Sequence, residues 1–218
     1  MRLVLLPGLG ADGRMYSGLR LPGLEIAAPD WPAPEPRSSL PSFARALADR
    51  LQIGPDAAVG GSSFGGFVAA EIAARRRVRA LVLIGSALSP AEIPSTFAVI
   101  ERLSRLLPER LLDRAPRDNP LVLAKFGRLT APQRALFLDM ASKAPASLLR
   151  HGLRMTFGWE GVRKEDLSCP LHRIHGRLDR LIPPPPAREA ELVAGGGHLI
   201  AMTHPAAVIR FLRRSLDS

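Results

Sequence analysis

A serine in a glycine-rich turn is the residue of this chain best suited to nucleophilic chemistry. The segment Gly60–Gly66 reads GGSSFGG and fits the pattern G-x-S-x-G with Ser63 at its centre. The pattern is typical of a sharp strand-to-helix turn, whose strained backbone requires neighbours without a Cβ. Such a turn exposes the hydroxyl beside a helix N-terminus, where backbone N–H groups favour negative charge. We therefore predict that Ser63 is a nucleophile; the alternative is a turn that holds an ordinary serine.

A serine hydroxyl is a weak nucleophile at neutral pH, so it needs a base and a group that orients the base. Asp179 follows the predicted strand Leu171–His175, and His198 follows the predicted strand Ala190–Ala194. The carboxyl ends of parallel strands meet at one edge of a sheet, where sites collect in open α/β folds. We expect His198 to be the general base and Asp179 to orient its ring.

The other histidines and carboxylates are weaker candidates. His172 and His175 lie within a predicted strand, where a hydrogen-bonded core histidine is expected, and His204 lies at a helix start. Glu165 and Asp166 precede the same strand, so they fall at the opposite edge of the sheet. No Cys, His, Asp or Glu cluster has the spacing of a metal site, and we predict no metal.

The glycine-rich loop after the first predicted strand, Arg2–Leu6, has two interpretations. Gly8–Gly13 fits the G-x-G-x-x-G fingerprint of dinucleotide-binding proteins. That fingerprint needs a long helix after its last glycine, but only about two helical turns fit before the next Pro-Gly pair. The other use of such a loop is an oxyanion hole, in which the N–H of Leu9 points at a carbonyl oxygen held over Ser63. We favour the oxyanion hole and predict no cofactor.

Buried strands alternate with helices along much of the chain. Helices are expected at Ser42–Ile53, with Ser42 as its N-cap, and at Phe67–Arg76. This alternation indicates parallel β-α-β units and an α/β fold with an open, mostly parallel sheet of about six strands and helices on both faces. The strands are expected at Arg2–Leu6, Leu24–Ala28, Ala57–Gly60, Ala80–Ile84, Leu171–His175 and Ala190–Ala194.

The alternation stops at Pro90, and residues 90–160 contain only helical patterns. An apolar stripe and a capping-box pattern starting at Thr130 predict two of these helices. We predict that this insertion packs over one edge of the sheet and forms a lid above an apolar pocket at Ser63. The stripe consists of Phe97, Ile100, Leu103 and Leu107.

Length and composition favour one domain, 1–218, with a single good core. No apolar run approaches the ~20 residues of a membrane span. The N-terminal apolar run breaks at Pro7, too early for a signal peptide. The one cysteine, Cys169, cannot form an internal disulfide, which agrees with a reducing compartment. We therefore predict a cytoplasmic protein without a membrane span.

The chain is strongly basic, with a net charge of +10. Nucleic-acid binding is one explanation of such a charge. However, the basic residues are scattered along the chain, and aromatic residues make up only 5%, which is few for base stacking. We therefore predict no nucleic-acid partner, and the remaining alternatives are a solvated basic surface or one that attracts an anionic substrate or partner.

Four segments, in order, resemble the motifs of the α/β-hydrolase superfamily: LLPGLGADGRMY the oxyanion loop, GGSSFGG the nucleophile elbow, IHGRLDRLIP the acid loop and GGGHLI the histidine loop. The chain order Ser63, Asp179, His198 is also that of the superfamily. The resemblance implies that Ser63 is the nucleophile, that His198 is the general base and then acid, and that Asp179 orients it. It further implies an oxyanion hole made by the backbone N–H groups of Leu9 and Phe64.

Two features depart from the superfamily pattern. The chain lacks the usual first two strands and opens on the third, which agrees with a sheet of about six strands. The oxyanion loop has Pro7-Gly8 where many members have His-Gly. This change removes a side chain, although the backbone donor can remain.

The leading hypothesis is a serine hydrolase that cleaves a small-molecule carboxylic ester through an acyl-enzyme. An alternative is an esterase or thioesterase acting on a substrate bound to an acidic acyl-carrier protein, because the compact size and helical lid resemble the pimeloyl-carrier methyl ester esterases. Arginines of the insertion could meet such a carrier. These arginines are Arg102, Arg105, Arg110, Arg114, Arg128 and Arg134.

Two further classes are a dinucleotide-binding protein that uses Gly8–Gly13 and a non-catalytic binding protein with a hydrolase fold. The intact set of serine, aspartate and histidine argues against the second of these.

Overall fold

The computed structural model describes residues 1–35, 37–95 and 120–216 of the chain. Within these residues one six-stranded sheet has the order β2-β1-β3-β4-β5-β6, and every pairing is parallel. This confirms the predicted α/β fold with an open parallel sheet. The strands are β1 (Arg2–Leu6), β2 (Glu25–Ala27), β3 (Ala57–Ser62), β4 (Leu81–Ile84), β5 (Leu171–Gly176) and β6 (Glu191–Val193).

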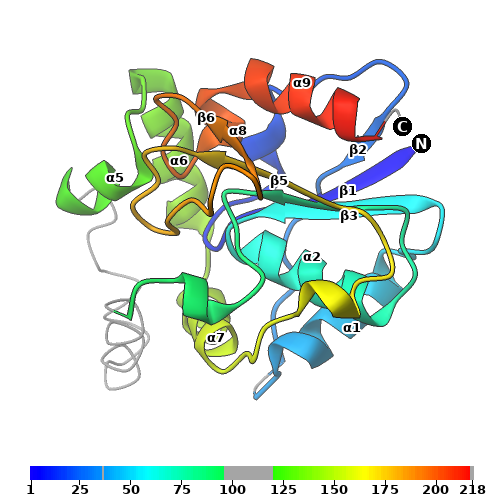
Figure 1. Cartoon of the computed structure of the whole chain (residues 1–218). Helices are drawn as coiled ribbons and strands as arrows, with labels where there is room; N and C mark the ends of the chain where they lie inside the picture. The colour runs from blue at the N-terminus through cyan, green and yellow to red at the C-terminus, as the bar shows by residue number, and fades with distance from the viewer. Residues whose placement is uncertain (36, 96–119, 217–218) are drawn as a thin grey trace.

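Helices cover both faces of the sheet, which is why its central strands are apolar on both sides. Helices α1 (Leu40–Arg50) and α2 (Phe64–Arg75) pack on one face, and α8 (Ile200–Thr203) and α9 (Pro205–Leu216) pack on the other (Figure 1). Each face therefore has its own apolar core. Because the sheet is packed between these two cores, the carboxyl ends of β1, β3, β4 and β5 are held in fixed positions.

The predicted start of α1 is wrong. The helix begins at Leu40, and Ser39 is the N-cap, whose hydroxyl accepts from the N–H of Ser42 at 3.2 Å. Ser42 completes a capping box by accepting from the N–H of Ser39 at 3.0 Å. Pro41 can stand inside the first turn because backbone N–H groups there have no partner within the helix.

The helix after Ser63 also starts earlier than predicted. It was expected at Phe67–Arg76, but α2 begins at Phe64, directly after the serine. The turn between β3 and α2 is therefore tighter than the glycine-rich sequence indicated.

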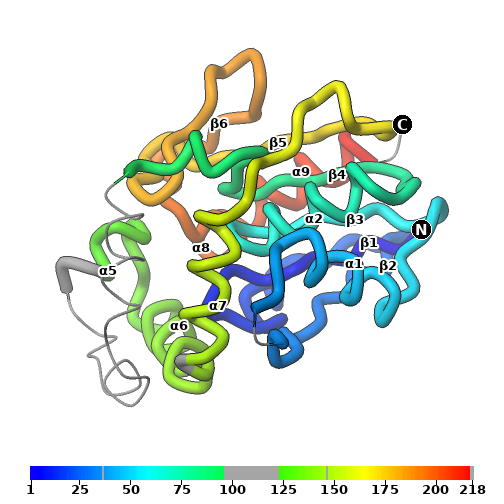
Figure 2. Tube along the Cα trace, turned by 90° about the horizontal axis from the view of Figure 1, so that it is seen from below, coloured from blue at the N-terminus to red at the C-terminus, as the bar shows by residue number. Residues whose placement is uncertain are grey.

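The helices described between β4 and β5 gather at the end of the sheet toward which the strands run (Figures 1 and 2). The predicted stripe from Phe97 to Leu107 lies outside the described residues. At the start of α6 the N–H of Thr130 donates to Gln133 Oε1 at 2.9 Å, as the capping-box pattern indicated. The elements are η2 (Pro90–Glu92), α5 (Pro120–Phe126), α6 (Ala131–Lys143) and α7 (Ala146–Phe157), and η3 (Lys164–Asp166) follows them.

In the part of the chain that the structure describes, none of the helices has the length and apolar character needed to cross a bilayer.

The N-cap assignment gives a first prediction. Ser39→Ala removes the hydroxyl that accepts from Ser42, and it should lower the free energy of unfolding by about 1 kcal/mol. The neighbouring variant Ser38→Ala is the matched control and should change it by less than about 0.5 kcal/mol. Urea unfolding of both variants measures the difference, and equal losses would contradict the assignment.

Candidate active site

Ser63 occupies a strained turn at the carboxyl edge of the sheet. It follows the last residue of β3 and precedes α2, with φ 52° and ψ −123°. A positive φ is unfavourable for a residue with a side chain, so the surrounding structure must hold it. The hydroxyl of Ser86, after β4, donates to the carbonyl oxygen of Ser63 at 2.7 Å and is one such restraint.

The glycines on either side of Ser63 are required by close backbone contacts. A Cβ on Gly65 would lie 2.1 Å from the carbonyl oxygen of Leu6, and a Cβ on Gly61 would lie 2.4 Å from the carbonyl carbon of Gly65. These are the positions that the G-x-S-x-G pattern reserves for glycine. The structure therefore has the strand-turn-helix arrangement that the sequence predicts.

Asp179 and His198 meet at the same edge, although they come from different loops. Asp179 Oδ2 lies 2.8 Å from His198 Nδ1. A carboxylate can only accept, so Nδ1 carries the hydrogen and the lone pair of the neutral ring is at Nε2. The other oxygen, Oδ1, accepts from the N–H groups of Leu181 and Ile182 at 2.9 and 3.0 Å.

The surroundings of Asp179 favour its charged form. Burial alone would raise the pKa of this carboxyl. The positive charge of His198 in its protonated form, and hydrogen bonds from His175, His198 and the Ile182 N–H, oppose the effect of burial and together outweigh it. The pKa of Asp179 therefore lies well below its ordinary value, and the carboxylate is available to stabilise a protonated His198.

A second histidine, His175, contacts the same carboxylate, although its place within a strand predicts only a core residue. His175 Nε2 lies 3.1 Å from Asp179 Oδ2 and 2.8 Å from the carbonyl oxygen of Ile182. The carbonyl oxygen is an acceptor, so Nε2 carries one hydrogen, which it shares between the Ile182 carbonyl oxygen and Asp179 Oδ2. The available signal in the sequence was the position of His175, four residues before Asp179 where β5 ends.

Ser63 and His198 line one small cavity of about 160 Å³. Leu9 and Phe64, the residues predicted to supply oxyanion donors, line it as well. The structure thus brings the five predicted site residues together, with Asp179 behind the histidine. The rest of the wall is formed by Phe67, Ile93, Phe126, Leu153, Thr156, Phe157, Leu181 and Ile182.

The weaker candidates lie elsewhere. Ser62 is buried but does not line the cavity. His204 Nδ1 lies 2.8 Å from Thr203 Oγ1. Glu165 and Asp166 lie in η3, before the amino end of β5. Among the described residues no group of three or more His, Cys, Asp or Glu could hold a metal ion.

The glycine loop Gly8–Gly13 leads into η1 (Gly13–Tyr16), a 3-10 helix of four residues. The dinucleotide fingerprint requires a long helix at this point. The loop instead returns to the sheet, with Leu9 at the cavity of Ser63.

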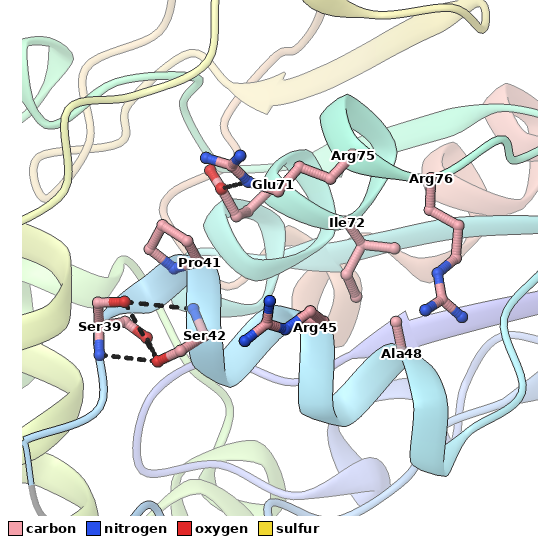
Figure 3. Close-up of a pocket in the computed structure, with 9 residues that line it drawn as sticks. All are labelled: Ser39, Pro41, Ser42, Arg45, Ala48, Glu71, Ile72, Arg75 and Arg76. Carbon is pink, nitrogen blue, oxygen red and sulfur yellow. Dashed lines mark hydrogen bonds and ion pairs between the residues drawn. The ribbon is translucent and has the colours of Figure 1, made fainter.

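A larger groove of about 370 Å³ lies between α1 and α2 (Figure 3). Arg75 pairs with Glu71 there, and Arg76 pairs with Asp49. The second oxygen of Glu71 accepts from the indole N–H of Trp159 at 2.8 Å. The lining holds no serine–histidine pair, so size alone does not make this groove the candidate active site.

An open parallel sheet with helices on both faces, and a serine turn, acid and histidine at its carboxyl edge, is the architecture of the α/β hydrolases. A model of the alpha/beta hydrolase family matches residues 3–211, and the chain belongs to this family. Family membership supports hydrolase activity. No curated protein matches the chain.

The chain is similar to several solved structures. An esterase from Thermogutta terrifontis has a TM-score of 0.76 at 21% identity, over 100% of this chain and 89% of that one. An enol-lactonase from Burkholderia xenovorans LB400 has a TM-score of 0.76 at 19% identity, over 100% and 91%. A bromoperoxidase from Bacillus anthracis has a TM-score of 0.73 at 17% identity, over 100% and 92%. At these sequence identities the similarity shows a shared fold and nothing more about this chain.

The arginines considered for a carrier-protein partner are mostly outside the described residues. Arg128 and Arg134 are exposed on the described part of the insertion. An acyl-carrier partner stays a prediction.

The buried carboxylate gives a second prediction. Because the pKa of Asp179 is lowered in the folded protein, its charge stabilises the fold above the unfolded-state pKa, and this contribution is lost as the pH falls below about 4. Asp179→Asn should therefore lower the free energy of unfolding by roughly 1–3 kcal/mol at neutral pH, and the difference from the wild type should shrink in acid. Denaturant unfolding across this pH range measures it.

The exposed variant Asp56→Asn is the matched control and should cost less than about 0.5 kcal/mol. A loss for Asp179→Asn that is constant from neutral to acid pH would contradict the assigned charge state.

Proposed function

We propose that this protein is a serine hydrolase that cleaves a carboxylic ester through an acyl-enzyme intermediate. The observation that carries the proposal is the shared cavity of Ser63 and His198, with the histidine ring bonded through Nδ1 to Asp179 at 2.8 Å. The positive φ of Ser63 adds support, because a strained backbone is retained where function needs it.

In the acylation step, Ser63 Oγ attacks the carbonyl carbon of the ester and His198 Nε2 accepts the hydroxyl proton. Asp179 stabilises the resulting imidazolium through Nδ1–H. The tetrahedral intermediate then collapses, its C–O bond to the leaving alkoxide breaks, and the proton on Nε2 passes to that oxygen. The products of this step are a free alcohol and an acyl group bonded to Ser63.

In the deacylation step, a water molecule attacks the acyl carbonyl carbon while His198 Nε2 accepts one of its protons. Collapse of the second intermediate releases the carboxylic acid and returns the proton to Ser63 Oγ. In both steps the negative charge on the carbonyl oxygen is assigned to the N–H groups of Leu9 and Phe64. Their residues flank the same cavity, and the Phe64 N–H stands in the first turn of α2.

The cavity also supports a substrate class. Its described wall is almost entirely apolar, and the one hydroxyl besides Ser63, on Thr156, donates to the carbonyl oxygen of Gly152 at 2.9 Å. Small-molecule pockets commonly measure about 300–1,000 Å³, so a space of about 160 Å³ suits a small group. The proposed substrate is therefore an ester whose acyl group is short and uncharged.

The role of Ser63 gives a third prediction. Ser63→Ala should reduce kcat for p-nitrophenyl butyrate by at least about 1,000-fold, because the acyl-enzyme cannot form. It should also abolish covalent labelling by a fluorophosphonate probe. The adjacent variant Ser62→Ala is the matched control and should keep most of the activity, because its side chain lies outside the cavity. Turnover by Ser63→Ala near the wild-type rate would overturn the proposal.

The size of the cavity gives a fourth prediction. Across p-nitrophenyl esters, kcat/KM should be highest for acetate to hexanoate and should fall by about 10-fold or more for decanoate, which overfills the space. Leu153→Ala removes part of the wall and should move the optimum toward longer chains. A wild-type preference for decanoate would show that the acyl group lies elsewhere.

A further inference from the structure

Tyr16 joins the two loops on which the proposed chemistry depends. Its hydroxyl donates to the carbonyl oxygen of Leu6 at 2.7 Å and accepts from the N–H of Ser62 at 2.9 Å. Both roles are fixed, because a carbonyl oxygen can only accept and an N–H can only donate. The phenolic hydroxyl therefore hydrogen-bonds both strands at once: it donates its proton to β1 and accepts a hydrogen bond from β3.

The two bonded groups lie close in the sequence to the proposed oxyanion donor and to the nucleophile. Leu6 is the last residue of β1 and is followed by the loop that carries Leu9, and Ser62 is the residue before Ser63. Leu6 and Gly61 form the last paired positions of the two strands. The phenol thus links the two strands at the point where the oxyanion loop and the nucleophile turn leave the sheet.

The loop that carries Leu9 packs against the nucleophile turn. A Cβ on Gly8 would lie 3.8 Å from Ser63 Cβ, so the oxyanion loop runs immediately beside the serine. The loop has two further restraints: the N–H of Gly8 is 3.3 Å from Met15 Sδ, and Trp31 Nε1 donates to the carbonyl oxygen of Gly8 at 3.2 Å. Met15 and Tyr16 both belong to η1, so this short helix contacts the loop at Gly8 and the end of β1 at Leu6.

Burial makes the Tyr16 hydrogen bonds hard to replace. The residue is 3% exposed, and water cannot easily take the place of its hydroxyl. Burial raises the pKa of Tyr16, while the hydrogen bond from Ser62 opposes the rise, and the net shift is upward. The phenol is therefore protonated at neutral pH and able to donate to Leu6.

We propose that Tyr16 is a positioning residue that fixes the separation between the Leu9 N–H and Ser63 Oγ, and so sets the oxyanion hole. The inference rests on the proposed function. Oxyanion donors act only within a narrow range of distance, about 2.7–3.1 Å from the developing charge, and losing one donor lowers kcat by 10²- to 10³-fold. Tyr16 touches no reacting atom, so its removal should misplace a donor without removing it.

The first test is Tyr16→Phe, which deletes only the phenolic oxygen. We expect kcat for p-nitrophenyl butyrate to fall about 10- to 100-fold, with KM within about twofold of the wild type. The affinity for a boronic acid, whose boron bonds to Ser63 Oγ as a tetrahedral adduct, should fall in parallel with kcat/KM.

The matched control is Val78→Ala. Val78 is buried between the end of α2 and the amino end of β4, in the core that contains neither Met15 nor Tyr16, so this variant also lowers stability without changing the packing around Tyr16. It should lower the melting temperature but leave kcat within about twofold of the wild type. Equal losses of kcat in both variants, or no loss in Tyr16→Phe, would overturn the proposal.

A second measurement does not depend on whether Tyr16→Phe folds. Tyr16 is the single tyrosine of the chain, so biosynthetic 3-fluorotyrosine labels this site alone. We expect the fluorine NMR resonance to shift when the boronic acid forms its adduct and to stay unchanged in Ser63→Ala. A resonance that does not shift when the adduct forms would contradict the proposed positioning role of Tyr16.

The two proposals fail in different ways. A wild-type protein that does not hydrolyse esters, or an active Ser63→Ala variant, contradicts the proposed function. A wild-type protein that depends on Ser63 but is indifferent to Tyr16→Phe contradicts only the role of Tyr16.

Discussion

The candidate site depends on a close backbone approach between the turn after β3 and the end of β1. The chain can place Ser63 at a positive φ, with α2 starting at the next residue, only because Gly61 and Gly65 leave room for neighbouring main-chain atoms. A methyl group at Gly65 would come within 2.1 Å of the Leu6 carbonyl oxygen. The same closeness brings the loop of Leu9 beside the serine, so one steric constraint shapes both the nucleophile turn and the proposed oxyanion hole.

The acid side of the site is built differently, from hydrogen bonds instead of close packing. Asp179 is a buried carboxylate, and a buried charge is costly unless donors surround it. Two backbone N–H groups, His175 and His198 supply those donors and hold the carboxylate in one orientation. The orientation of His198 is therefore decided by a loop that is itself fixed by His175 at the end of β5.

The apolar cavity lies between the nucleophile turn and the acid loop, and helices form most of its wall. Leu153, Thr156 and Phe157 reach it from α7, and Phe126 reaches it from α5, while Phe64 and Phe67 line it from α2. Helices described between β4 and β5 therefore contribute to its shape, whereas the sheet edge contributes the polar groups. This division allows one fold to accept different substrates, because the polar groups can stay in place while the helices above them change.

The amino-acid sequence by itself determined the sheet, its parallel strands and the places in the chain where chemistry could occur. Apolar runs and glycine spacing are local signals, and they led to Ser63, Asp179 and His198 because each follows a strand that ends at the same edge. Local signals failed at the starts of two helices, where alternative starting residues have nearly the same local energy. Ser42 and Ser39 both suit an N-cap, and the sequence does not show that α2 begins at Phe64.

Only the tertiary structure decided which side chains from distant segments touch. No pattern indicated that the Tyr16 hydroxyl would join Leu6 to Ser62, or that His175 would share the carboxylate of Asp179. The physical reason is that a hydrogen bond depends on distances of a few tenths of an ångström between groups far apart in the chain. Those distances are set by the packing of both cores against the sheet, which no short stretch of sequence contains.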